Sequence, residues 1–429
     1  MQIYVIRQGD SLWNIARAFN TTVEEIQRAN EIPDPDRLVA GQALVIPIEG
    51  RYYWVQPGDS LWAIGRRFGI DYRELARINN INPNATLQVG LRLYIPPRTK
   101  IRAEVNAYIE PVGDMVSPSL LLAAQQAAPN LTYLAPFSYQ VTRDGGLNPM
   151  PLNGLPEIAE RNNTTLMMTV TNIEEGRFSE ELARAVLQDE TSQQTLLDNI
   201  VAEARRVGVF SDAHFDFEFI PVDLRQAYTE FLRRATKRLR GEGLLVSAAL
   251  APKTSAQQMG QWYEAHDYQA IGSIVDFVVI MTYEWGFSGG PPMPVSPIGP
   301  VEQVLRYALS EMPSYKIMMG QNLYGYDWTL PFVRGQTFAT AISPQQAIQI
   351  AMDNNVAISY DFRAQAPFFN YTDAEGNRHI VWFEDARSIQ AKIDLLKRLG
   401  IRGISFWKLN FNFPQAWLLV EDNLNVVKR

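Results

Sequence analysis

Three side chains that can exchange protons stand at alternate positions of one apolar segment. His214, Asp216 and Glu218 alternate with phenylalanines in the sequence DAHFDFEFIP, residues 212–221. In a β-strand this period of two places all three on one face, with successive members ~6.5–7 Å apart at Cα. Two neighbouring carboxyls raise one pKa, which keeps Glu218 protonated near neutrality and suits it to general acid catalysis.

The spacing of the two acids narrows the chemistry further. Asp216 and Glu218 approach a bound molecule from the same side, whereas most retaining glycosidases place their carboxyls on opposite sides of the scissile bond. The pair therefore favours substrate-assisted hydrolysis, in which the N-acetyl group of the sugar is the nucleophile. A metal site at His214, Asp216 and Glu218 is the alternative, but the other two histidines lie in unrelated segments.

The elements around this segment predict an α/β fold of the (β/α)8 barrel type, the TIM barrel, over residues 98–429. Amphipathic stretches that favour helices lie between apolar runs, at 191–207, 223–241, 301–311 and 384–399. Residues at the carboxyl ends of barrel strands face the pocket, so the fourth run positions the acids. A small α+β insertion is expected at about 326–380. The eight strand-like runs are 104–110, 131–137, 165–170, 214–220, 244–250, 274–283, 316–324 and 402–407.

The first hundred residues are an ungapped duplication. Residues 5–30 are echoed by 55–80, with matching positions 49 apart, such as Gly41 and Gly90. Each unit, 1–48 and 51–97, has the pattern strand, helix, helix, strand. We expect four large apolar residues to lie in the small cores of these units, namely Leu12, Trp13, Leu61 and Trp62.

These units resemble the LysM module, through "GDSLW", an Asn at the end of the second helix and a closing "IP". The resemblance implies binding to N-acetylglucosamine glycans such as peptidoglycan and chitin. Residues 1–97 contain ten Arg, no Lys and ten acidic residues, which fits a neutral glycan. The predicted glycan-binding residues are Gly9, Asp10, Ser11 and Asn30 in the first unit, and Gly58, Asp59, Ser60 and Asn80 in the second.

The remaining chain resembles glycoside hydrolase family 18, whose signature D-G-x-D-x-D-x-E ends as residues 216–218 do. The resemblance implies that Glu218 protonates the leaving oxygen, that Asp216 orients the acetamido group and that Tyr283 hydrogen-bonds its carbonyl. His214 departs from the signature, and is placed to hydrogen-bond Asp216. The predicted substrate-binding residues are Trp407 as the floor under the sugar, with His214, Glu284, Gln321, Tyr324, Asn172 and Tyr139.

Within that family the chain most resembles the spore-cortex-lytic branch of Bacillus, through the paired LysM units, "FDFEFIP", "MTYEWG" and "WFEDARSI". This implies a peptidoglycan N-acetylglucosaminidase in the spore coat and cortex region or the cell wall. A chitinase of the same family is one alternative. A non-catalytic peptidoglycan-binding coat protein is the other, because position 214 departs from the signature.

Composition limits the remaining possibilities. The 39 basic and 46 acidic residues give a net charge of −7 without a basic block, which argues against nucleic-acid or anionic-membrane binding. The chain has no cysteine, and neither a signal peptide nor an apolar run of ~18 residues is visible. We expect no metal and no organic cofactor. The patterns carry no information on oligomeric state.

Overall fold

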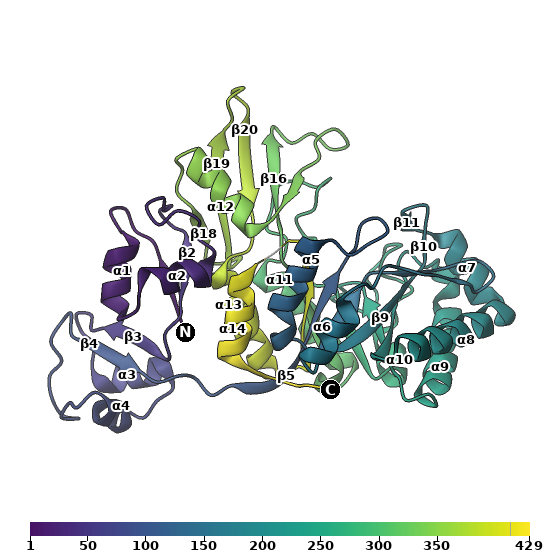
Figure 1. The fold of residues 1–429 in the computed structure, drawn as a ribbon, viewed down its shortest axis with the longest axis horizontal. Helices are drawn as coiled ribbons and strands as arrows, with labels where there is room; N and C mark the ends of the chain where they lie inside the picture. The colour runs from purple at the N-terminus through teal and green to yellow at the C-terminus, as the bar shows by residue number, and fades with distance from the viewer. Residues whose placement is uncertain (412) are drawn as a thin grey trace.

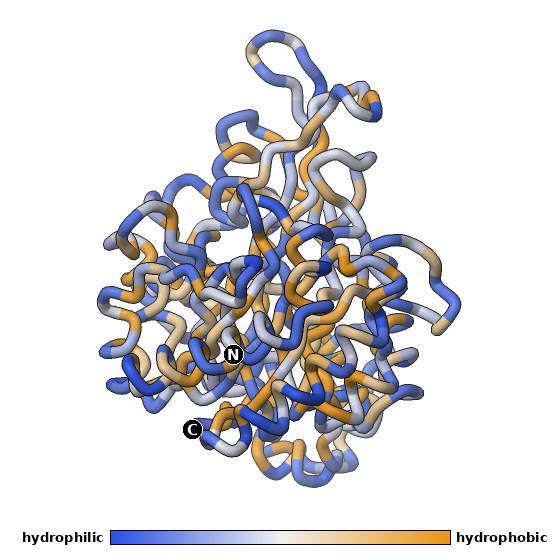
Figure 2. Tube along the Cα trace, turned by 90° about the vertical axis from the view of Figure 1, so that its right-hand side faces the viewer, coloured by the Kyte–Doolittle hydropathy of each residue, from blue (hydrophilic) through white to orange (hydrophobic). Residues whose placement is uncertain are grey.

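The computed structural model describes residues 1–411 and 413–429. Two small modules, an eight-stranded barrel and an inserted sheet make up the chain (Figure 1). Hydrophobic segments concentrate in the interior and hydrophilic ones at the outer loops (Figure 2). In the described part of the chain, no helix combines the length and the apolar character needed to cross a bilayer.

The two N-terminal modules share one β-α-α-β order, and each closes with an antiparallel strand pair. Ser11 and Ser60 cap the first helix of each module by accepting a hydrogen bond from a backbone N–H. The first module consists of β1 (Gln2–Val5), α1 (Leu12–Phe19), α2 (Val23–Asn30) and β2 (Ala43–Ile46). The second consists of β3 (Arg51–Trp54), α3 (Leu61–Phe68), α4 (Tyr72–Ile78) and β4 (Arg92–Ile95).

Two of the four residues predicted to lie in the cores of these modules are confirmed. Leu12 and Leu61 are buried, but Trp13 and Trp62 are 61% and 56% exposed. Both indoles lie on the outer side of a helix, where the guanidinium one turn later covers each ring: Arg17 at 5.5 Å and Arg66 at 4.9 Å. The prediction that the tryptophans are core residues is therefore wrong, because other apolar side chains of the helices and strands make up the core of each module.

The predicted barrel is confirmed. Eight parallel strands close on themselves, and each is followed by at least one helix. The strands are β5 (Ile101–Ile109), β6 (Tyr133–Pro136), β9 (Thr165–Thr171), β12 (Phe210–Asp216), β13 (Leu245–Leu250), β14 (Phe277–Ile280), β15 (Ile317–Asn322) and β21 (Gly403–Trp407). The helices are α5 (Pro118–Ala127), α6 (Leu155–Arg161), α7 (Glu180–Gln188), α8 (Glu190–Val207), α9 (Arg225–Arg240), α10 (Tyr268–Ile274), α11 (Ile298–Glu311), α13 (Ala386–Leu399) and α14 (Pro414–Asn423).

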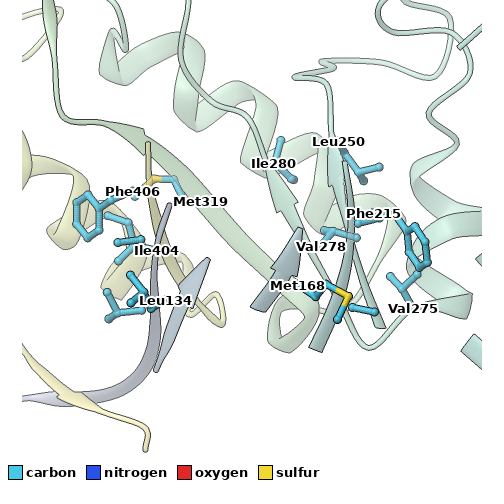
Figure 3. Close-up of a cluster of buried hydrophobic side chains, with 14 of the residues drawn as sticks. Leu134, Met168, Phe215, Leu250, Val275, Val278, Ile280, Met319, Ile404 and Phe406 are labelled. Atoms are coloured by element: carbon cyan, nitrogen blue, oxygen red, sulfur yellow. The ribbon is translucent and has the colours of Figure 1, made fainter. Parts of the chain in front are cut away.

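Alternation along the strands separates two environments. Outward side chains such as Met168, Phe215 and Ile404 join one apolar cluster with the helices (Figure 3). Inward positions instead carry aromatic residues and buried polar groups, among them Asn106 and His214. The barrel interior is thus polar where an ordinary core would be aliphatic, which marks it as the functional part of the fold.

The insertion follows β15 and forms a five-stranded antiparallel sheet with one helix. In Figure 1 it stands above the barrel, and the first module lies beside it and beside α13 and α14. Its elements are β16 (Gly325–Leu330), β17 (Thr340–Ile342), α12 (Pro344–Asp353), β18 (Ser359–Asp361), β19 (Ala366–Thr372) and β20 (Arg378–Trp382).

Candidate active site

The two predicted acids lie at the carboxyl end of β12 and line one cavity of about 330 Å³. Asp216 is the last strand residue, and Glu218 stands two residues beyond it. Phe215 and Phe217 point outward and pack on Phe231 of α9. Phe219 does not continue this pattern, because its backbone turns into the left-handed region (φ +52°) and its ring stacks on Trp262.

Burial determines the protonation of the two acids. Desolvation raises the pKa of Asp216 to about 7. Desolvation and the nearby Asp216 carboxyl hold the pKa of Glu218 well above its usual range. This shift favours the protonated form of Glu218, which is the form a general acid requires.

Asn172 fixes the backbone of Glu218. Its amide oxygen accepts from the Glu218 N–H at 2.9 Å, and its amide nitrogen donates to the Glu218 carbonyl at 2.9 Å and to that of Ser179 at 3.0 Å. The side chain is fully buried. This corrects the prediction that Asn172 binds substrate, because its hydrogen-bonding groups hold the catalytic loop instead.

Trp262 was missed by the sequence reasoning. It lies in the irregular segment between β13 and α10, lines the cavity, and its indole N–H donates to Glu218 Oε2. That bond occupies one carboxyl oxygen and leaves the proton to Oε1. No motif or periodicity marks a lone tryptophan in a loop, so no pattern in the sequence points to it.

His214 has a different role from the predicted one. It is fully buried, its Nε2 lies 2.8 Å from the Tyr108 hydroxyl and its Nδ1 lies 2.7 Å from Ser247 Oγ. Ser247 donates onward to Asp212 at 2.7 Å. Burial lowers the pKa of His214 to about 3, so the ring is neutral. These partners correct both expectations for His214, sugar contact and a hydrogen bond to Asp216.

Tyr283, Glu284 and Tyr324 also line the cavity. Gly320 makes room for the Tyr283 ring, because a Cβ there would come within 2.9 Å of Tyr283 Cε1. Glu284 accepts hydrogen bonds from the hydroxyls of Tyr324 and Tyr326. Burial raises the pKa of Glu284, although both hydroxyl donors oppose the shift.

Aromatic rings complete the cavity. Trp407 ends β21 and packs edge-on against Phe137 at 4.8 Å and Tyr108 at 5.4 Å. A flat aromatic wall beside two carboxyls suits a pyranose ring, whose C–H face is apolar and whose hydroxyls are polar.

Two further predicted substrate contacts lie elsewhere. Gln321 is fully buried and donates to Asn322. Tyr139 is buried on the strand β7 (Tyr139–Val141), where its hydroxyl donates to Glu203 of α8 at 2.7 Å. Both are corrected to structural residues, because neither side chain lines the cavity: the Tyr139 hydroxyl bonds a helix, and the Gln321 amide nitrogen bonds Asn322 of its own strand.

The predicted module residues also prove largely structural. Asp10 accepts from the Tyr4 hydroxyl and the Arg7 N–H, both at 2.7 Å, and Asp59 does the same with Tyr53 and Gln56. These bonds close the tight turns that contain Gly9 and Gly58, both with positive φ. Direct sugar contact at Gly9, Asp10, Ser11, Gly58, Asp59 and Ser60 stays a prediction.

The asparagine predictions need correction. Asn30 is 7% exposed, and its amide bonds the backbone of Ile26 and Val45. Its counterpart in the second module is Asn79, not Asn80, because Asn79 makes the same bonds to Leu75 and Tyr94. Asn30 and Asn79 therefore join a helix to a strand, and Asn80 simply follows with φ +54°.

Comparison with known families agrees with this arrangement. The model of glycosyl hydrolases family 18 matches residues 133–412, and the LysM domain model matches 4–47 and 53–96. This chain is a member of glycosyl hydrolase family 18. It is a glycosidase by family and carries two LysM domains. The described residues contain no group of three His, Asp or Glu side chains arranged to hold a metal ion.

Relatives of known structure or activity extend the likeness over the whole chain. The chain is 63% identical, over 429 residues, to the cortical fragment-lytic enzyme of Bacillus subtilis, covering 100% of this chain and 99% of that protein. The crystal structure of the spore cortex-lytic enzyme SleL of Bacillus megaterium superimposes with a TM-score of 0.92 at 52% identity, covering 100% and 99%. A chitinase structure from Chromobacterium violaceum matches at 25% identity with a TM-score of 0.68, covering 75% of this chain and 98% of that one.

Proposed function

We propose that this protein is an N-acetylglucosaminidase that cleaves the β-1,4 bond after N-acetylglucosamine in spore-cortex peptidoglycan fragments, with retention of configuration. The observation that carries the proposal is the pair Asp216 and Glu218, which line one cavity and in which desolvation and the Asp216 carboxyl raise the pKa of Glu218. The full-length similarity to the cortical fragment-lytic enzyme supports cortex fragments as the substrate. It also supports a place in the spore coat and cortex region.

The roles of the residues follow from their positions around the cavity. Glu218 donates its proton from Oε1 to the glycosidic oxygen while the acetamido oxygen of the substrate attacks the anomeric carbon. The C–O bond to the leaving sugar breaks, and an oxazolinium ion forms. Asp216 stabilises that cation and Tyr283 donates to the acetamido oxygen. Water then attacks the anomeric carbon and Glu218, now a carboxylate, accepts its proton, while the bond between that carbon and the acetamido oxygen breaks and restores the N-acetyl group.

Glu284 and Trp407 hold the sugar. Glu284 is fixed by two tyrosine hydroxyls, so its remaining acceptor capacity points into the cavity as a rigid group. Trp407 offers an apolar face at the cavity wall. Tyr324 acts in this scheme through Glu284. The two LysM modules add binding to the same insoluble glycan, which raises its effective concentration near the cavity.

Product analysis tests this assignment. Cortex fragments, vegetative peptidoglycan and N-acetylglucosamine oligomers are incubated with the wild type, Glu218→Gln and Asp216→Asn, and the products are identified by mass spectrometry. We expect reducing-end N-acetylglucosamine from cortex fragments, and a loss of at least ~10³-fold with Glu218→Gln. Cleavage of N-acetylglucosamine oligomers alone would indicate a chitinase. Glycan binding without any product would indicate a non-catalytic protein.

The raised pKa of Asp216 gives a second test, through stability. A carboxyl whose pKa is higher in the folded than in the unfolded state stabilises the fold at low pH and loses that contribution as pH rises through about 7. Asp216→Asn should therefore raise the free energy of unfolding at pH 8 by on the order of 2 kcal/mol, and with it the melting temperature. At pH 4 it should give no gain. An equal gain at both pH values would contradict the protonation scheme.

A further inference from the structure

The two LysM modules meet different surroundings at the same two loops. In the first module the turn 6–10 and the segment 38–40 face residues 351–352 and 355–357 of the insertion across a cavity of about 450 Å³. In the second module the corresponding positions 56–59 and 88–90 are solvent-facing, and Val89 is 65% exposed. The two loops of the first module are thus enclosed by the insertion, whereas the two loops of the second module are open to solvent.

Specific contacts hold the insertion against the first module. Val39 is buried in a cluster with Ile342, Ala347 and Ile358 of the insertion. The Ile358 N–H donates to the Ala40 carbonyl at 2.9 Å. Residues 351–358 of the insertion therefore stay in place beside the first module.

The lining of this cavity has the mixed character of a sugar site. Leu38, Met352 and Val356 offer apolar surface, and Gln8 and Asn355 offer polar groups at the rim. Its charges balance, because Arg7 is matched by Asp10. A volume of about 450 Å³ falls in the range of ~300–1,000 Å³ typical of small-ligand sites. The balance of charge favours a neutral ligand over a phosphate or an acidic peptide.

We infer that the first LysM module and residues 351–358 of the insertion together form one slot for a neutral N-acetylglucosamine-containing glycan chain. This inference rests on the proposed glycan-binding function of the modules and adds residues of the catalytic domain to it. The insertion also lines the catalytic cavity, through Tyr326 and Ala341. A glycan in the slot is therefore held at a fixed separation from the cavity, whereas the second module binds as an open surface.

Hydrogen exchange on the full chain tests the slot. The Glu218→Gln background prevents cleavage, and the probe is the β-1,4-linked tetramer of N-acetylglucosamine. We expect the tetramer to slow exchange at 351–358 together with 6–10 and 38–41. Protection at 55–59 and 87–91 reports the second module independently. Protection of the second module with no change at 351–358 would overturn the inference.

Two variants sharpen the test from the side of the insertion. Ala357 is exposed and lines the cavity, so Ala357→Trp fills the slot without disturbing a core. It should abolish the protection at 6–10 and 351–358 and leave that of the second module intact. Val89→Trp is the matched variant in the second module. Unchanged protection of 351–358 in Ala357→Trp would contradict the slot.

The second variant removes a polar group without backbone strain. Asn355 has φ +51°, so glycine fits its backbone, and Asn355→Gly should weaken tetramer binding at the slot by roughly three- to tenfold. Unaltered affinity would argue against a sugar contact at the rim. Cleavage of cortex fragments is measured in parallel on the same variants with Glu218 intact. Normal cleavage without slot protection overturns this inference alone, and absence of both overturns the proposed function as well.

Discussion

The two LysM modules are copies of one unit whose surroundings have diverged. The backbone is nearly the same: Gly41 and Gly90 both have φ near +85°, and Asn30 and Asn79 make the same helix-to-strand bonds. What differs is the residue after the shared Leu38 and Leu87. Val39 is apolar and buried against the insertion, whereas Gln88 is polar and exposed. Val39 is thus one of the contacts that dock the first module, together with the Arg37–Asp353 ion pair and the Gln415–Asn30 hydrogen bond.

The largest expected effect comes from a methyl group at the paired glycines. A Cβ at Gly41 would lie 1.8 Å from the Ile358 carbonyl oxygen, whereas one at Gly90 meets nothing within 4 Å. Both alanine variants carry ~1–2 kcal/mol of left-handed backbone strain. Gly41→Ala should lose at least ~2 kcal/mol more through the clash. Denaturant unfolding of both variants measures the difference, and equal losses would mean that the docked contact is not close-packed.

Exchanging the neighbouring residues should have the next largest effect. Val39→Gln buries an amide in the cluster around Ile342 and Ile358, and is expected to reduce stability by ~2 kcal/mol. Gln88→Val changes an exposed position and should stay within ~0.5 kcal/mol. The same unfolding experiment compares the two. Limited proteolysis of 351–358 then reports whether the first module has separated from the insertion.

The paired asparagines should differ less. Asn30→Ala and Asn79→Ala each leave strand backbone groups without a partner, at ~1 kcal/mol or more. Asn30 also accepts from Gln415 of α14 at 2.6 Å, so its loss should be larger by about 1 kcal/mol. Asn80→Gly is the control, because it keeps the backbone geometry and removes none of these bonds. A larger loss of stability in thermal unfolding for Asn79→Ala than for Asn30→Ala would contradict the docked arrangement.

The exposed ion pair between module and insertion should matter least. Arg37 Nη2 lies 3.1 Å from Asp353 Oδ1, and both side chains are about half exposed. Arg37→Thr introduces the residue found at position 86 of the second module, and should change stability by less than ~0.5 kcal/mol. The small change should vanish at 1 M salt, where exposed pairs are screened. A salt-independent loss would assign Arg37 a packing role instead.

The sequence predicted elements and the acid pair more reliably than the partners of individual side chains. Apolar strand-like runs between helical stretches identified the eight barrel strands, because outward aliphatic and aromatic residues recur on each. The same reasoning failed at Phe219, where the strand has already ended and a positive φ reverses the direction of the side chain. Strand ends depend on turns that alternation does not report.

The hydrogen-bond partners of polar residues near strand ends were harder to predict from the sequence. Asn172, Gln321 and Tyr139 follow strands as catalytic contacts do, but their hydrogen bonds go to neighbouring backbone or helices. Which partner a polar group finds is a tertiary property that spacing alone does not fix. His214 illustrates the same point, because its two partners come from β5 and β13. Trp13 and Trp62 were assigned to the core by type, although covering arginines let them lie outside.

The order of the modules along the chain has a consequence for how the molecule comes apart. The second module is the one joined to the barrel by the exposed stretch 97–100, yet the first module is the one docked against the insertion and α14. The chain therefore leaves the catalytic domain and returns to it. A single protease cut in 97–100 severs the peptide link but none of the docking contacts, so the nicked protein should still migrate as one particle.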